Sequence, residues 1–208
     1  MKRESHRARG PMGRLMIAAL LSVVHGCGGV SISSPVDDET KSVGRLPANA
    51  SVSIAALAGD GLADQASVPS VNRASRILGI AGRVPLIATR GRRRFLVGRI
   101  PGGFCLLEKS STTGAITSVC DTEASVARQG ALVLSGADQG DSTFLALLVP
   151  DGTSTVTLGS KSPVLPDNNF VLLPIEDVDR EAKVIIVRNT ARRALRVRDF
   201  LPARAVVG

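Results

Sequence analysis

Residues 94–108 read Arg-Phe-Leu-Val-Gly-Arg-Ile-Pro-Gly-Gly-Phe-Cys-Leu-Leu-Glu, and this stretch decides the fold class of the chain. Two short runs rich in Phe, Val, Leu and Ile flank the tight break Pro101-Gly102-Gly103, which is the pattern of a β-hairpin. Similar runs, separated by turn residues, recur at residues 84–89, 115–120, 131–135, 143–149, 154–158, 169–174 and 183–188. Closely spaced short runs of this kind predict a mainly β protein, with a small antiparallel β-sandwich or barrel-like domain.

One or two short helices are expected beside the strands. The pattern predicts a helix over residues 70–80, capped by Ser70 and ended by Gly79. A second helix is predicted over residues 122–129, capped by Asp121 and also ended by a glycine. Residues 51–83 therefore form a loosely ordered segment with a helix at the entrance to the β domain.

The C-terminal part of the chain fits two structures. As a helix, Asn189 would cap residues 190–201; as a hairpin, the chain would turn at Asn189-Thr190-Ala191. We favour the hairpin, because Leu195 and Val197 alternate with arginines at the period of a strand.

The composition sets the class of the protein. The chain has 208 residues, of which 44% are hydrophobic, so it can build a core and one compact domain with tails is the expectation. Lys and Arg number 26 against 18 Asp and Glu, a formal net charge of +8. No apolar run reaches the ~20 residues that a spanning helix needs, which excludes a polytopic membrane protein.

The N-terminus has the pattern of an export signal. Five basic residues and one Glu within residues 1–14 precede an apolar run over residues 15–24. Ala8 separates Arg7 from Arg9, so the twin-arginine pair is missing and general secretion in the unfolded state is expected. Met12 would also start a complete, shorter signal.

The end of this run, Val24-His25-Gly26-Cys27, resembles the lipobox of bacterial lipoproteins. The resemblance implies cleavage before Cys27, with Val24 and Gly26 in the aliphatic and small positions, and a lipid on the Cys27 sulfur. His25 departs from the lipobox pattern, and ordinary secretion is the alternative. The expected location is thus extracytoplasmic, at the cell membrane through the lipid anchor.

Cysteine parity agrees with a lipid on Cys27. The chain has three cysteines, so a modified Cys27 leaves Cys105 and Cys120 as a matched pair in an oxidising compartment. The predicted strands place Cys120 opposite Cys105 on its neighbour. Closing this loop of about fifteen residues would stabilise the fold by roughly 3 kcal/mol.

A second resemblance covers about residues 84–200. Five segments are similar, in this order, to those of a family of secreted actinobacterial proteins of unknown function. They are Phe95-Leu96-Val97, Phe104-Cys105-Leu106-Leu107, Cys120, Leu147–Val156 with its Val-Pro-Asp-Gly turn, and Asn169-Phe170-Val171. The resemblance implies an extracytoplasmic β domain with a structural disulfide, and it implies no activity.

The predicted organisation has five parts. They are a signal peptide over 1–26, the anchor cysteine and a flexible linker rich in Ser, Gly and Pro over 27–50, the loosely ordered segment 51–83, the β domain 84–201 and a tail over 202–208.

Most enzyme classes are excluded by what the mature chain lacks. Both histidines leave with the signal, so a Ser-His-Asp triad, a Cys-His pair and a His-containing zinc site are ruled out. The nucleophile elbow, dinucleotide and phosphate-loop motifs are missing too, and we expect neither a cofactor nor a bound metal. A secreted carboxylate-dependent hydrolase remains the alternative, with four acids as its candidates, Asp138, Asp141, Glu176 and Asp179.

Clustered arginines are the candidate binding residues. One group surrounds Gly91 and a second lies near the C-terminus; the members are Arg90, Arg92, Arg93, Arg94, Arg192, Arg193 and Arg196. They could attract anionic lipid headgroups or anionic envelope polymers, at roughly 1 kcal/mol for each basic residue near such a surface. The alternative is a solvated flank of a hairpin. Nucleic acid is not expected as a partner, because export separates the protein from it and stacking aromatics are scarce.

The expected function is therefore that of an exported, membrane-anchored lipoprotein with a non-enzymatic role. It would bind an anionic envelope polymer or another surface protein, or serve as a structural domain of the envelope.

Overall fold

The computed structural model describes residues 52–59, 62–137, 143–175 and 180–201, all within one unit of the chain, residues 33–208. The predicted signal peptide, Cys27 and the whole linker lie outside the described residues, and so do the four acids of the hydrolase alternative and the tail. No helix among the described residues is long and apolar enough to cross a membrane.

The mainly β fold is confirmed. Ten strands form three antiparallel sheets, and each of the nine predicted runs overlaps one strand; the strands are β1 (Leu86–Arg90), β2 (Arg93–Ile100), β3 (Gly103–Ser110), β4 (Ile116–Thr122), β5 (Leu132–Ala137), β6 (Thr143–Leu148), β7 (Thr153–Leu158), β8 (Phe170–Pro174), β9 (Lys183–Arg188) and β10 (Ala191–Arg196). The favoured C-terminal hairpin is also confirmed, because β10 pairs with β9 in antiparallel register from Ala191 opposite Arg188.

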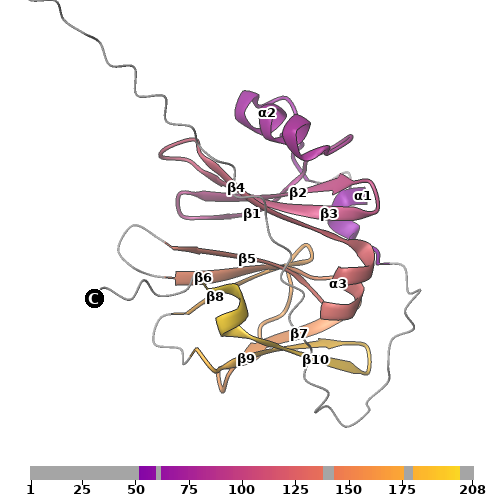
Figure 1. The fold of residues 1–208 in the computed structure, drawn as a ribbon, viewed down its shortest axis with the longest axis vertical. Coiled ribbons are helices and arrows are strands. Elements are labelled where there is room, and N and C mark those ends of the chain that lie inside the picture. Colours follow the sequence, from indigo (N-terminus) through magenta and orange to yellow (C-terminus); the bar gives the residue numbers. More distant parts are fainter. Residues whose placement is uncertain (1–51, 60–61, 138–142, 176–179, 202–208) are drawn as a thin grey trace, which may run out of the picture. The chain divides into compact units, whose positions relative to one another are not determined.

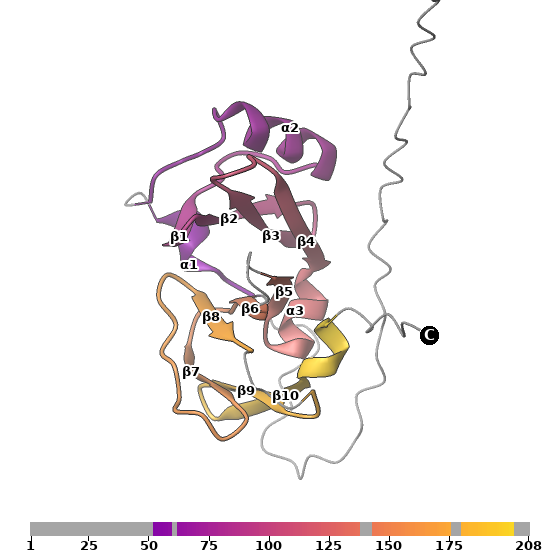
Figure 2. The ribbon, with the colours of Figure 1, turned by 90° about the vertical axis from the view of Figure 1, so that its left-hand side faces the viewer.

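The three sheets are stacked in layers (Figure 1). We name them the first sheet (order β1-β2-β3-β4), the central sheet (order β5-β6-β8) and the third sheet (order β10-β9-β7). A two-sheet sandwich would have one core between its sheets, whereas here separate apolar clusters fill the space on each side of the central sheet. Figure 2 shows the same order of layers from the side, with α2 (Pro69–Leu78) beyond the first sheet.

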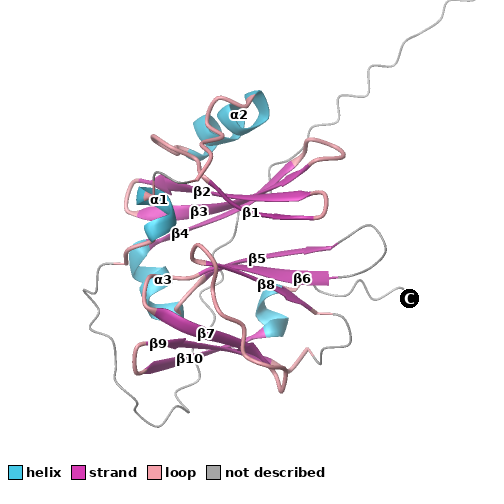
Figure 3. Cartoon of the chain, turned by 180° about the vertical axis from the view of Figure 1, so that it is seen from behind, coloured by secondary structure: helices cyan, strands magenta, loops and turns pink. Residues whose placement is uncertain are grey.

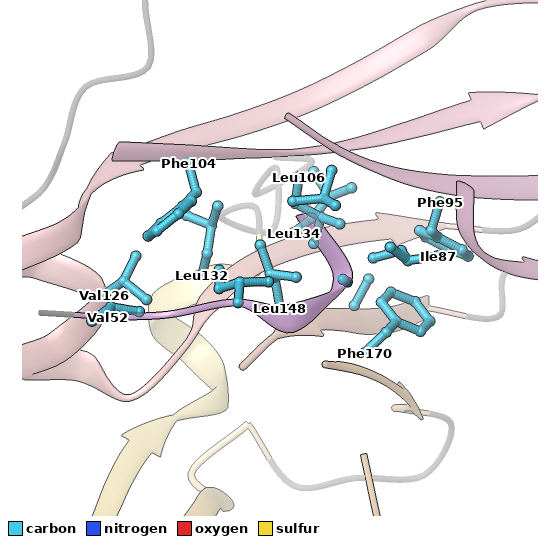
Figure 4. Close-up of a cluster of buried hydrophobic side chains, with 14 of the residues drawn as sticks. Val52, Ile87, Phe95, Phe104, Leu106, Val126, Leu132, Leu134, Leu148 and Phe170 are labelled. Atoms are coloured by element: carbon cyan, nitrogen blue, oxygen red, sulfur yellow. The ribbon is translucent and has the colours of Figure 1, made fainter. Parts of the chain in front are cut away.

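The sequence of β6 explains its central place. Phe144, Ala146 and Leu148 belong to the cluster shared with the first sheet, whereas Leu145 and Leu147 belong to the cluster shared with the third sheet. Side chains alternate along a strand, so an uninterrupted apolar run makes both faces apolar and favours burial on both sides. Figure 4 shows the first of these clusters, with Phe95 and Phe104 of the first sheet among its members.

Each of the two longer helices begins one residue away from the position that the sequence predicts. α2 starts with Pro69 after Val68, so Ser70 lies inside the helix and is not its cap. This start follows from the missing N–H of proline, which costs nothing in the first turn. Gly79 ends α2 at φ 71°, as predicted.

The second predicted helix is α3 (Glu123–Gln129), and its cap is Thr122. The Thr122 hydroxyl accepts a hydrogen bond from the Ser125 amide at 3.2 Å. Asp121, the predicted cap, instead accepts a hydrogen bond from the amide of Thr122 at 2.7 Å. Gly130 ends α3 at φ 84°, as predicted. Figure 3 shows how few of the described residues are helical.

The segment before α2 is part of the core rather than a loose entrance. Three residues at this end of the chain are buried in the cluster between the first and central sheets. Val52 and Ile54 precede α1 (Ala55–Ala58), and Ala56 lies within it. The packed core therefore begins at least as early as Val52, well before the boundary at residue 84 that the strand pattern suggests.

Candidate functional site

The first group of arginines lies at one end of the first sheet. Strands β1 and β2 form a hairpin in which Arg90 is opposite Arg93, and the turn consists of Gly91 and Arg92. Gly91 has φ 55°, a left-handed conformation in which glycine is favoured. Because side chains alternate along β2, Arg93 and Arg94 point to opposite faces of the sheet.

Arg93 faces inward, toward the central sheet. Its guanidinium forms an ion pair with Glu108, donates a hydrogen bond to the carbonyl of Ala137, and lies 4.6 Å from the centre of the Phe144 ring. The side chains of Arg93 and Glu108 are only 16% and 8% exposed. This geometry makes Arg93 a link between two sheets and removes it from the predicted set of surface contacts.

Arg94 faces outward and has a second cation beside it. Lys109 on β3 is directly opposite Arg94, on the face that α2 covers further along the sheet. Like charges directly opposite each other in an antiparallel pair repel and destabilise the sheet. Among the described residues, neither Arg94 nor Lys109 forms an ion pair.

A shallow depression of about 230 Å³ lies between these cations and the β3–β4 loop. Its lining comprises two cations, two serines and a glycine, namely Arg94, Lys109, Ser110, Ser111 and Gly114. Exposed Arg90 ends β1, and exposed Arg92 lies on the adjoining turn. We call this surface, with Arg90 and Arg92 included, the basic end of the first sheet.

Hydrogen bonds hold the β3–β4 loop in place. The Ser110 amide donates to the carbonyl of Ala115 at 3.0 Å, and the Gly114 amide donates to the carbonyl of Ser110 at 2.9 Å. The Ser111 amide donates to the carbonyl of Arg92 at 2.7 Å, which joins this loop to the β1–β2 turn. The β1–β2 turn and the β3–β4 loop are therefore fixed relative to each other.

The C-terminal arginines do not join this group. They lie on β10 in the third sheet, on the far side of the central sheet from the basic end (Figure 1). Arg192 is exposed, whereas Arg193 and Arg196 are half-buried. The seven predicted contacts are thus divided between two layers, and the first layer holds the three exposed arginines that lie close together.

The disulfide prediction is confirmed. Cys105 and Cys120 are directly opposite each other on β3 and β4 and are bonded. Cys105 is buried in the cluster under α2, together with Leu96 and Leu107. The bond joins β3 to β4 on the same face as Lys109, four positions from it along β3.

A second depression, of about 400 Å³, results from the docking of the N-terminal segment. It is lined by Ala55, Ala56, Gly59, Leu62, Asn168 and Asn169. Asn169 accepts a hydrogen bond from the Ala56 amide at 3.0 Å and donates to Asp151 at 2.7 Å. This amide is used to hold the fold together and is not free for a ligand.

Asp151 completes the clamp on the N-terminal segment. Its carboxylate accepts a hydrogen bond from the Ala55 amide at 2.8 Å. Burial alone would raise the pKa of Asp151, but hydrogen bonds from Ala55, Ser53 and Asn169, with the charge of Arg188, together lower that pKa below its usual value of 3.8. A lowered pKa means that the folded state favours the charged form of the carboxylate.

Lys109, Ser110 and Ser111 are absent from the sequence prediction, although a signal for Lys109 exists. The turn at Pro101-Gly102 pairs Ile100 with Gly103, and six steps back along each strand reach Arg94 and Lys109. Counting register across the hairpin therefore finds the paired cations, whereas inspecting charge along the chain misses them.

The described residues offer no metal centre, since they hold no group of three His, Cys, Asp or Glu side chains placed to share an ion.

Comparison of the chain with protein-family models, curated proteins and solved structures finds no match.

Proposed function

We propose that this protein is an exported, lipid-anchored, non-enzymatic protein that binds anionic material of the cell envelope through the basic end of the first sheet. The observation that carries the proposal is the outward pair of Arg94 and Lys109, which repel each other without an ion-pair partner among the described residues. An unfavourable like-charge pair is relieved when an anion binds between its members.

The charges around this pair support the proposal. Two arginines elsewhere are paired with acids, Arg99 with Glu123 at 3.5 Å and Arg198 with Glu181 at 2.8 Å. Glu108 is next to Lys109 in the sequence, but it faces inward and pairs with Arg93. The outward field of the basic end is therefore not cancelled by its nearest acid.

The disulfide supports the extracytoplasmic part of the proposal. Disulfides persist in oxidising compartments and are rare in the bacterial cytosol. The bond between Cys105 and Cys120 fits the export signal over residues 1–26 and the lipobox-like sequence that ends at Cys27.

The anchor is tested by the intact mass of the protein from the membrane fraction of its host. We expect a chain that begins at Cys27, carries added acyl mass and gains about two hydrogens on reduction of its disulfide. An unlipidated chain in the culture medium would contradict the anchor and leave the secreted alternative.

The binding role is tested with vesicles. The mature chain, residues 27–208 with Ala in place of Cys27, has neither signal nor lipid and is sedimented with vesicles of phosphatidylcholine alone or mixed with phosphatidylglycerol. We expect binding to the anionic vesicles only, and a loss of about 30-fold in affinity for Arg94→Gln/Lys109→Gln, at roughly 1 kcal/mol for each cation.

A matched control removes two exposed cations elsewhere. The variant Lys183→Gln/Arg192→Gln carries the same change in charge on the third sheet. We expect it to bind nearly as well as the parent chain. Equal losses in the two double variants would contradict a site at the basic end and indicate attraction by net charge alone.

A further inference from the structure

We infer that the group recognised in the depression is a phosphoryl group, held between Arg94 and Lys109 and contacted by the Ser111 hydroxyl of the β3–β4 loop. This inference rests on the proposed function and gives its site a chemical class of ligand. Phosphoryl groups occur both in lipid headgroups and in polymers of polyol phosphate, and the chemistry at the site is the same for both.

The strand register sets the spacing of the two cations. Directly opposite residues of an antiparallel pair have Cβ atoms about 4.5–5.5 Å apart. The Arg94 and Lys109 side chains can therefore reach the same anionic group. Arginine presents a fork of donors that fits two oxygens, and lysine adds a compact positive charge that can meet a third oxygen.

A hydroxyl beside the two cations makes the site suited to a group with more than two oxygens. A carboxylate has two oxygens, which one guanidinium fork can occupy. A phosphoryl group presents additional oxygens, and Ser110 and Ser111 line the depression beside the cations. Ser110 is directly opposite the inward-facing Arg93, so its side chain lies on the inner face, where its oxygen accepts a hydrogen bond from the Thr113 amide at 3.2 Å.

Ser111 supplies the hydroxyl donor beside the cations. Among the described residues its hydroxyl makes no hydrogen bond, while its backbone amide is held by the carbonyl of Arg92. The position of this serine is thus fixed by the backbone, and its side chain remains free to meet a ligand.

The size of the depression agrees with such a group. A volume of about 230 Å³ corresponds to roughly seven or eight water molecules, at about 30 Å³ each. This space accommodates a phosphoryl group and part of the alcohol esterified to it. The opening of the site to solvent allows the rest of a polymer or a lipid surface to remain outside.

The test is a titration of the mature chain, residues 27–208 with Ala in place of Cys27, followed through its backbone amide signals by NMR. The probes are inorganic phosphate, glycerol 3-phosphate and acetate, all at matched ionic strength. We expect the phosphate probes to shift the amide signals of Lys109 and residues 110–114, with an affinity at least about tenfold above that of acetate.

Variants assign the contacts. We expect Lys109→Gln to weaken phosphate binding about fivefold or more, at the value of one cation near an anion, and the control Lys183→Gln to leave it unchanged. Ser111→Ala is expected to lower affinity for phosphate and to leave affinity for acetate unchanged. Equal affinity for acetate and phosphate would overturn the inference, as would shifts that map away from residues 109–114.

The inference and the proposed function fail separately. Anionic vesicles that still bind through Arg94 and Lys109, without phosphate shifts at the loop, would overturn the phosphoryl site and retain the proposed function. Failure of the parent chain to bind anionic vesicles would overturn the proposed function itself. Competition of vesicle binding by a soluble polymer of glycerol phosphate would identify a polymer as a source of the group, whereas vesicle binding without competition would identify the lipid headgroup.

Discussion

The inner and outer faces of the first sheet, at the end that carries Arg93 and Arg94, show how the same residue types serve two purposes. On the inner face, Arg93 is paired with Glu108 and buried against Phe144, where it joins the first sheet to the central sheet. On the outer face, Arg94 is opposite Lys109, and the two cations have no acid between them. Neutralised charge inside holds the sheets together, whereas uncancelled charge outside leaves a surface that an anion can complete.

Breaking the inner pair should have the largest effect on stability. We expect Glu108→Ala to lower the free energy of unfolding by about 3 kcal/mol or more, because it leaves a buried arginine without its partner. Urea denaturation measures the change. The double variant Arg93→Met/Glu108→Leu should recover most of the loss, since apolar residues of similar volume can replace a buried ion pair.

The outer face supplies the control for this experiment. Arg94→Met removes a charge one residue away but on the exposed side, so we expect a change within about 0.5 kcal/mol. If Arg94→Met destabilised the protein as much as Glu108→Ala, the contrast between the two faces would be wrong.

Removing the disulfide should have the next largest effect. We expect Cys105→Ala/Cys120→Ala to lower the free energy of unfolding by about 3 kcal/mol, because the bond closes a loop of fifteen residues in the unfolded chain. Thermal unfolding with and without a reductant measures it. The reductant should destabilise the parent chain and leave the double variant unchanged; the same sensitivity in both would contradict the assignment.

Acidification should weaken the clamp on the N-terminal segment. The pKa values of Asp151 and Asp64 are lowered below 3.8 in the folded protein. Their contribution is therefore present above the unfolded pKa and is lost as the pH falls below about 4, toward the folded values. We expect Asp151→Asn to cost about 2 kcal/mol at pH 7 and to flatten the fall in stability between pH 5 and pH 2.

Hydrogen exchange locates this effect. Protection of the Ala55 and Ala56 amides should fall in the Asp151→Asn variant, since both amides are held by the Asp151–Asn169 clamp. A variant that kept the full pH dependence of the parent chain would show that other carboxylates control acid stability.

Relieving the outer pair should have the smallest effect, and the opposite sign. Lys109→Gln removes a like charge directly opposite Arg94, so we expect a gain of a few tenths of a kcal/mol. Urea denaturation at low ionic strength is the measurement. A clear loss of stability would mean that Lys109 contributes a structural contact instead of repulsion.

The strands and their order along the chain could be predicted because their signals are local. Alternating or continuous apolar runs and glycine-rich turns depend on neighbouring residues only, as does the Cys105–Cys120 pairing once the hairpin is assigned. Helix starts were displaced because a proline at the first position and a threonine cap compete with nearby Ser70 and Asp121.

The stacking of the sheets and the fate of each arginine could not be predicted in the same way. The third layer depends on which sheet covers each apolar face, and this is decided by contacts far apart in the sequence. Arg93 and Arg94 are adjacent and identical in type, and the strand pattern separates their faces without showing that Glu108 and Phe144 lie on only one of them.

The central claim is tested most directly by thermal unfolding of the parent chain and of Arg94→Gln/Lys109→Gln. Both proteins are measured with and without 10 mM phosphate at matched ionic strength, a concentration of about ten times a Kd of 1 mM. We expect the double variant to be slightly more stable without phosphate. Phosphate should raise the Tm of the parent chain alone, by about 2–4 °C for each kcal/mol of binding. Equal shifts in both proteins, or a variant less stable than the parent chain without phosphate, would contradict the account.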